Sequence, residues 1–143
     1  GAVASEKTPL LQYFQATRLN TPEAWRAVVD FAPTDEYLSR RAKQQLIRLY
    51  LADGNYDAAL PLCDELVALD SKEAELRAFG QAGRAVALSG KGLFTDSAQA
   101  IAAFQSLSDE LHDNALRERL KAAEQKNNQS LNPKESPSPP GEG

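Results

Sequence analysis

Residues 46–70 read LIRLYLADGNYDAALPLCDELVALD, and this stretch decides the fold. On both sides of Asp53-Gly54-Asn55, apolar residues recur every three or four positions, which is the spacing of one face of an α helix. A helix rarely continues through Gly-Asn, because glycine readily adopts the left-handed conformation that ends helices. The stretch therefore predicts two antiparallel helices, at about 36–53 and 56–69, joined by a tight turn.

One spacing of residues recurs along the chain. Three segments place a small residue four positions before one apolar residue and seven before another: Ala24, Val28 and Phe31; Ala59, Cys63 and Leu66; Ser97, Ile101 and Phe104. Residues at this spacing share one face of a helix. Repeated units of this kind stack so that each buries its neighbour's apolar face, which is typical of a solenoid.

The hairpin resembles the tetratricopeptide repeat (TPR), a pattern of 34 residues on two antiparallel helices. Leu46, Tyr50 and Ala59 stand where that pattern has Leu, Tyr and Ala, whereas Lys43 and Ser71 replace its aromatic residue and its proline. The resemblance covers about residues 9–112. It implies an all-α fold, an α-α superhelix (a TPR-like solenoid) of about three helix hairpins plus a C-terminal capping helix.

The domain boundaries follow from composition and helix-start residues. Residues 1–8 are short and polar, and residues 127–143 are rich in Pro and Ser, so both segments are expected to be disordered around a helical domain at 9–126.

Thr8-Pro9 and Thr21-Pro22 are typical helix starts. Thr34 and Asp35 can cap the helix at 36–53, and Asp70 or Ser71 can cap the one at 72–88. If Asp57 caps the helix at 56–69, Pro61 falls in its first turn, and if that helix starts earlier, Pro61 must kink it. The other helices are expected at about 72–88, 95–110 and 113–126. In the first helix Leu10, Leu11 and Phe14 give a short apolar stripe, and this helix is expected to end near Asn20.

Composition excludes several classes of protein. The chain has 143 residues, a net charge of −4 and an isoelectric point near 5.0, which argues against general nucleic-acid binding. No apolar run reaches the roughly 18 residues that cross a membrane. One cysteine cannot form an internal disulfide. The chain has no methionine at its start, so we expect a segment before Gly1, such as a signal or membrane anchor, to have been removed.

The residue types that carry chemistry are few. The chain has one histidine, His112, at an expected helix end, and one cysteine, Cys63, at a core position of the repeat. Structural zinc usually takes four Cys or His ligands, and the acidic residues follow helix spacing. We therefore expect no catalytic residues, no metal and no cofactor, and a protein that is not an enzyme. Trp25 is expected to pack between helices.

Arg41, Gln44 and Arg48 form a polar strip on the helix at 36–53. In the TPR the first helix of each repeat lines a concave groove, so the resemblance implies that these three residues face a ligand. The alternative interpretation is a solvated helix face. Because arginine suits planar carboxylates, a partner segment that is acidic or ends in a carboxylate is expected.

Two functions remain open. The first is a non-catalytic scaffold that binds a peptide or partner protein through a TPR-like concave surface. The alternative is a structural or assembly part of a membrane-anchored bacterial envelope protein, which acts by oligomerisation or spacing. The first predicts another protein as partner, without nucleic acid or direct membrane insertion. The second predicts an extracytoplasmic, membrane-tethered location, although a cytoplasmic location and a homo-oligomer are also compatible with the sequence.

Overall fold

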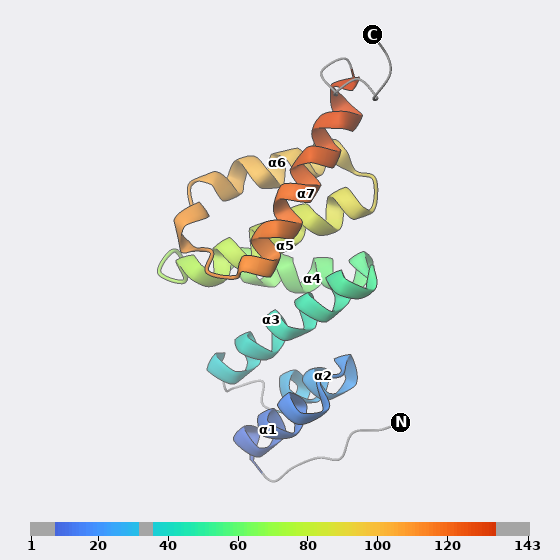
Figure 1. Cartoon of the computed structure of the whole chain (residues 1–143). Helices are drawn as coiled ribbons and strands as arrows, with labels where there is room; N and C mark the ends of the chain where they lie inside the picture. Colours follow the sequence, from blue (N-terminus) through green and yellow to red (C-terminus); the bar gives the residue numbers. More distant parts are fainter. Residues whose placement is uncertain (1–7, 32–35, 134–143) are drawn as a thin grey trace.

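The computed structural model describes residues 8–31 and 36–133, which form seven α helices, one short 3₁₀ helix and no strand (Figure 1). The elements are α1 (Pro9–Leu19), α2 (Pro22–Phe31), α3 (Glu36–Asp53), α4 (Tyr56–Val67), α5 (Ala74–Gly90), α6 (Phe94–Gln105), η1 (Ser108–Glu110) and α7 (Asn114–Leu131). The predicted all-α class is confirmed for these residues. The caps expected at Thr34 and Asp35, and the segments 1–7 and 134–143, lie outside the described residues.

The helices stack in chain order along one direction. Each helix packs against the next, and α1, α3, α5 and α7 also pack against one another in turn. Helices α1 and α2 therefore lie at one end of the stack, and α6 and α7 lie at the other (Figure 1). This order brings the first helix of each successive pair to one side of the molecule.

The turn at Asp53-Gly54-Asn55 lies between two helices, as the sequence predicts. Helix α3 ends at Asp53, Gly54 has a φ of +73°, and the Asn55 side chain caps α4 by accepting a hydrogen bond from the backbone N–H of Ala58. Because the cap is Asn55 and not Asp57, Pro61 lies inside the helix instead of in its first turn. Helix α4 therefore lacks one backbone hydrogen bond in its second turn.

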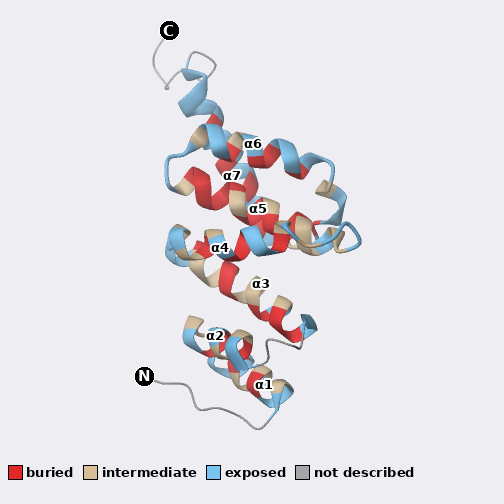
Figure 2. Ribbon diagram, turned by 180° about the vertical axis from the view of Figure 1, so that it is seen from behind, coloured by how far each residue is buried: buried red, intermediate tan, exposed pale blue. Residues whose placement is uncertain are grey.

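The repeated spacing marks the core. Eight of its nine residues are buried, and the exception is Phe31, which is 39% exposed. Figure 2 shows buried residues along the inner faces of α3 to α7. The buried apolar residues form one cluster that extends through all seven helices. The spacing therefore identified inward faces in α2, α4 and α6.

The apolar stripe of α1 faces away from the core. Leu10, Leu11 and Phe14 are exposed, whereas Gln12 and Ala16 are buried. The ring of Tyr13 packs edge-on against Trp25, with 5.3 Å between ring centroids. Small Ala16 allows α1 to approach its neighbours closely. The face that contacts the core is therefore the less apolar one.

Two glycines set the close contact between α4 and α5. A Cβ atom on Gly80 would lie 2.9 Å from the carbonyl oxygen of Cys63, and one on Gly83 would lie 2.9 Å from its Sγ. Helix α5 begins at Ala74, later than predicted, and its N-cap is Glu73 and not Asp70 or Ser71. The Asp70 side chain instead accepts a hydrogen bond from the backbone N–H of Lys72 and holds the preceding turn.

The last helix is longer than predicted. Residues 127–131 were expected in a disordered tail, but α7 continues through them to Leu131. Asn127 is buried, and its Nδ2 donates a hydrogen bond of 2.8 Å to Oγ of Ser97. Ser97 Oγ in turn donates to the carbonyl oxygen of Ala85 at 2.7 Å. These hydrogen bonds pair the amide nitrogen of Asn127 within the core, whereas its Oδ1 is buried and accepts no hydrogen bond among the described residues.

Candidate functional site

A groove of about 670 Å³ lies between the N-terminal halves of α3 and α5. Its lining residues come from α3, from the start of α5 with the turn before it, and from η1: Glu36, Tyr37, Arg40, Arg41, Gln44, Lys72, Glu73, Ala74, Glu75, Leu76 and Glu110. Four are carboxylates and three are cations. The wall is thus mixed in charge, with apolar contributions from Tyr37 and Leu76.

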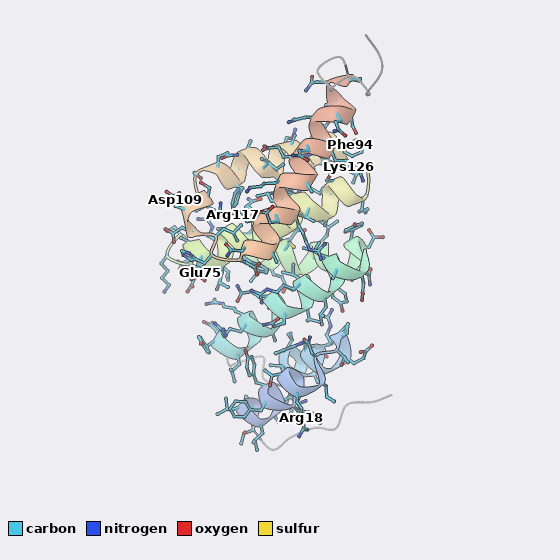
Figure 3. All side chains as sticks on the ribbon, in the orientation of Figure 1. Arg18, Glu75, Phe94, Asp109, Arg117 and Lys126 are labelled. Carbon is cyan, nitrogen blue, oxygen red and sulfur yellow. The ribbon has the colours of Figure 1, made fainter. Side chains whose placement is uncertain are left out.

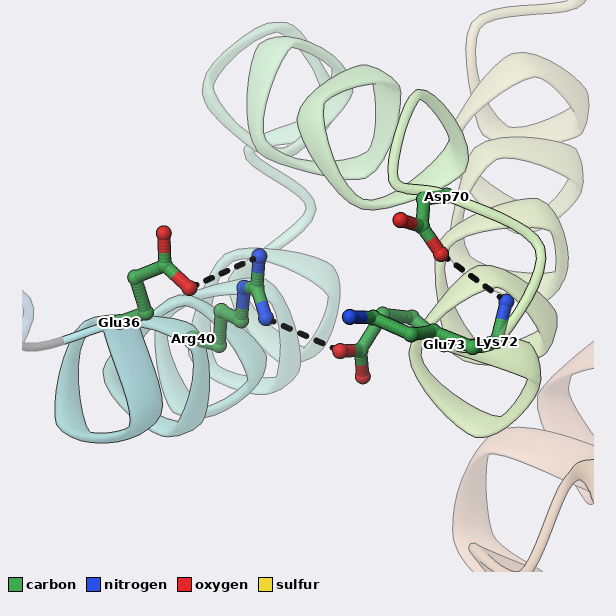
Figure 4. Close-up of polar contacts among 5 residues, drawn as sticks. All are labelled: Glu36, Arg40, Asp70, Lys72 and Glu73. Carbon is green, nitrogen blue, oxygen red and sulfur yellow. Dashed lines mark hydrogen bonds and ion pairs between the residues drawn. The ribbon is translucent and has the colours of Figure 1, made fainter.

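Arg40 spans the groove. Its Nη1 lies 3.2 Å from Oε1 of Glu73, and its Nη2 lies 3.6 Å from Oε2 of Glu36 (Figure 4). The first of these ion pairs connects α3 to the N-cap of α5, where a carboxylate is also stabilised by the helix dipole. The charge of Arg40 is therefore engaged within the protein.

A second hollow of about 190 Å³ continues from the first, with which it shares Gln44 and Glu75. Arg48 lies in its wall, with Nε 2.7 Å from Oδ2 of Asp113 and the guanidinium carbon 5.0 Å from the centre of the Phe79 ring. Phe79 is buried, so Arg48 covers an apolar side chain while it binds Asp113. The contact joins α3 to the start of α7.

Asp113 has a second role at this position. Its Oδ1 accepts a hydrogen bond of 2.8 Å from the backbone N–H of Leu116, which caps α7. Burial would raise the pKa of Asp113, but the hydrogen bonds from Leu116 and Arg48 outweigh it and hold this pKa below its ordinary value. Asp113 is therefore a carboxylate bound on both oxygens, and not a free proton acceptor.

Arg41 points toward the N-terminal end of the stack. Its guanidinium carbon lies 5.5 Å from the centre of the Tyr37 ring, and a side-chain hydrogen bond with Tyr13 raises the pKa of Arg41 above its ordinary value. Arg41 remains exposed and also lines the groove. Gln44 lies midway and lines both hollows.

Of the three predicted residues, Arg41 and Gln44 thus line the groove and Arg48 lines the adjoining hollow, but they do not form a free cationic strip. Arg48 is paired with Asp113, and the facing wall supplies Glu73, Glu75 and Glu110. The reason for expecting an acidic partner was a pair of unengaged guanidinium groups, so this geometry no longer supports that expectation. Sequence reasoning missed the facing wall because its residues Glu73, Glu75 and Glu110 lie 25 to 69 positions away in the chain.

The segment that closes the groove at η1 is fixed by Arg117. This side chain donates hydrogen bonds from Nη2 to the carbonyl oxygens of Ser108 and Leu111, at 2.8 and 2.6 Å. Figure 3 shows Arg117 on α7 beside this segment, with Asp109 and Glu75 on the same side of the molecule. The expected helix at 95–110 ends at Gln105, and the 3₁₀ turn that follows places Glu110 in the groove.

Cys63, His112 and Trp25, which the sequence analysis considered for chemistry or packing, do not line the groove. Cys63 is buried, and burial raises the pKa of its thiol to about 12, so the thiolate form is disfavoured at neutral pH. His112 is exposed beside the second hollow. Trp25 is buried, as predicted, and its ring N–H donates to Oδ1 of Asn20 at 2.9 Å. Among the described residues, no three His, Cys, Asp or Glu side chains are placed to hold a metal ion.

Within residues 8–31 and 36–133, no helix combines the length and the apolar character needed to cross a lipid bilayer. Compared with protein families, with curated proteins and with solved structures, the chain gives no match. The resemblance to the TPR stays a prediction from the residues quoted above. The groove residues are therefore interpreted from their own geometry.

Proposed function

We propose that the protein is a non-catalytic, TPR-like scaffold that binds an extended segment of another protein in the groove between α3 and α5. The observation that carries the proposal is the position of Arg41 and Gln44. Both side chains come from one helix face and line a hollow of about 670 Å³, which continues into a second hollow through Gln44. An elongated, open groove with polar walls suits a polypeptide better than a compact small molecule.

The charges of the groove favour a segment that carries both signs. Arg40 is engaged with Glu36 and Glu73, whereas no ion pair within the described residues involves Lys72, Glu75 or Glu110. A ligand with one basic and one acidic side chain can pair with these groups, while a uniformly acidic one would meet Glu75 and Glu110 with like charge. This mixed ligand replaces the acidic one expected from the sequence.

Selection from a library of random displayed peptides on the purified protein tests the proposal. Peptides selected on the wild type should bind the Arg41→Glu, Gln44→Glu double variant about tenfold more weakly or worse, since central interface residues contribute at least about 1 kcal/mol each. The matched control is Arg119→Glu, Gln125→Glu, which makes the same changes at exposed positions of α7. Equal loss in both variants, or in neither, would contradict binding in the groove.

Arg48 is unsuitable for this test, although it was one of the predicted binding residues. Its substitution would remove the ion pair with Asp113 and uncover Phe79. A loss of binding in an Arg48 variant would therefore mix destabilisation of the fold with loss of ligand contacts. Arg41 and Gln44 separate the two effects.

A further inference from the structure

The groove between α3 and α5 is bordered by a segment that belongs to no α helix. Residues 106–113 connect α6 to α7, and within them only Ser108–Glu110 form a helical turn. Leu107 and Leu111 pack against the core before and after Glu110, and Leu111 is 4% exposed. Glu110 itself is exposed and lines the groove. The segment therefore presents a carboxylate to the groove from a backbone that is anchored on both sides.

This segment lies where the two hollows meet. Glu110 lines the first hollow, and the next two residues, Leu111 and His112, line the second. Gln44 of α3 and Glu75 of α5 line both hollows. An extended polypeptide that occupies the two hollows must therefore pass Glu110 at their junction.

Arg117 of α7 holds the backbone on both sides of Glu110. Its Nη2 donates hydrogen bonds to the carbonyl oxygens of Ser108, at 2.8 Å, and of Leu111, at 2.6 Å. The backbone N–H groups of Glu110 and Leu111 donate only to carbonyl oxygens three positions earlier, those of Leu107 and Ser108. A single 3₁₀ turn of this kind has poorer hydrogen-bond geometry than an α helix, whereas hydrogen bonds from a charged donor are among the stronger ones. Arg117 therefore determines where Glu110 lies.

The carboxylate of Glu110 takes part in no ion pair within residues 8–31 and 36–133. In the same groove, Arg40 is engaged with Glu36 and Glu73. A Lys or Arg side chain of a ligand at the junction would pair with Glu110, whereas an acidic side chain there would be repelled. Glu75 adds a second negative charge from the α5 side of the junction.

We propose that Glu110 selects a Lys or Arg side chain of the bound polypeptide at the junction of the two hollows. Arg117 is the positioning residue that keeps Glu110 in place for this contact. The inference rests on the proposed function, since it requires a polypeptide in the groove. It adds the residue that reads the basic side chain and the residue that holds the reader.

Peptides that differ at one position test the selection by Glu110. In a peptide selected on the wild type, each Lys or Arg is replaced in turn by Gln, and the ratio of the two affinities is the charge preference. At one position the wild type should show a preference of about fivefold, the size of one partly exposed ion pair. In Glu110→Gln this preference should fall below about twofold. The matched control is Asp109→Asn, an exposed neighbour outside the groove lining, which should keep the preference.

Arg117→Met tests the positioning role, because it removes both hydrogen bonds to the segment. The charge preference should fall as in Glu110→Gln, and the double variant should fall no further, while the affinity for the Gln peptide stays within about twofold of the wild type. A merely structural role would weaken both peptides equally. Arg117→Lys, which keeps the charge without the planar fork, should lie between Arg117→Met and the wild type. The matched control is Arg119→Met, at an exposed position of the same helix.

Amide hydrogen exchange reads the same role without a ligand. The N–H groups of Glu110 and Leu111 should exchange faster in Arg117→Met, and those of α3 should not change. If the wild type selects no peptide, the proposed function fails and this inference fails with it. If peptides bind but show no charge preference, or keep it in Glu110→Gln, only the inference is overturned. A preference and exchange rates unchanged in Arg117→Met would overturn the positioning role.

Discussion

Arg48 and Asp113 are 65 residues apart in the chain, yet Nε of the arginine lies 2.7 Å from Oδ2 of the aspartate. The contact joins the central helix α3 to the first residues of α7, across the buried ring of Phe79. Asp113 simultaneously caps α7. One side-chain pair therefore connects the middle of the stack to its C-terminal end, beside the groove.

Substitutions at this pair should separate its two roles. Arg48→Ala should lower the free energy of unfolding by about 1 kcal/mol, because the pair is only partly shielded from solvent. Asp113→Ala should cost about 2 kcal/mol, since it also removes the helix cap. Asp113→Asn keeps a capping side chain and should resemble Arg48→Ala. Denaturant unfolding measures all three; equal losses for Asp113→Asn and Asp113→Ala would refute the capping role.

The same carboxylate predicts a pH dependence. The pKa of Asp113 is lower in the folded protein than in the unfolded chain, where it is about 3.9. The folded state is therefore favoured above about pH 4, and this contribution is lost as the pH falls through the folded-state pKa. When the pH falls from about 5 to about 3, the free energy of unfolding should decrease less in the Asp113→Asn variant than in the wild type. Parallel acid-denaturation curves for the two proteins would contradict this assignment.

Gly83→Ala should destabilise the protein by about 1–3 kcal/mol, although alanine is the better helix former. Its Cβ would lie 2.9 Å from Sγ of Cys63 and 3.3 Å from a methyl group of Ile47. In a Cys63→Ala background the sulfur is absent, so the same substitution should cost less. A double-mutant cycle that shows simple additivity would mean that the close contact with Cys63 does not limit this position.

Cys63 should behave as a structural residue. Cys63→Ser should cost about 1–3 kcal/mol, because it places a hydroxyl group among apolar neighbours. The thiol should react slowly with a thiol reagent until the protein unfolds. Burial raises the pKa of the Cys63 thiol to about 12 in the folded protein. The protonated thiol therefore stabilises the folded state fully below the unfolded-state pKa, and this stabilisation is lost as the pH rises toward 12. Rapid labelling of the native protein at neutral pH would reverse this interpretation.

Asn127→Ala should cost about 1–2 kcal/mol, since it removes a buried hydrogen bond to Ser97. The matched control is Asn128→Ala, at an exposed neighbouring position, which should stay within about 0.5 kcal/mol of the wild type. Thermal unfolding of the two variants compares them directly. If both are equally stable, the extension of α7 beyond residue 126 contributes nothing to the fold.

Local patterns in the sequence predicted local structure well. Helix α3 has the expected bounds, the turn at Gly54 is in place, and the repeated spacing predicted eight buried residues. The periodicity of apolar residues did not identify the buried face of α1, because the apolar face of that helix is not the one that packs against its neighbours. In α1 the three large apolar residues Leu10, Leu11 and Phe14 face outward, and the buried face carries small Ala16 and polar Gln12 instead.

The groove could be predicted only in part. One wall follows from helix spacing, which places Arg41, Gln44 and Arg48 on one face of α3. The other wall depends on how α5, η1 and α7 pack, and no local pattern shows that Arg48 meets Asp113. The burial of Asn127 could not be predicted for a similar reason. A polar residue beside a polar tail resembles the start of a loop until its partner Ser97 is known.

Site-specific photo-crosslinking in the source cell tests the central claim most directly. A benzophenone amino acid at Gln44 lies in the middle of the proposed groove, and the same amino acid at Gln125 lies on the exposed face of α7. The account predicts a discrete cross-linked protein with the probe at position 44, absent with the probe at 125 and weakened by Arg41→Glu. The same adduct from both positions, or none from position 44, would contradict it.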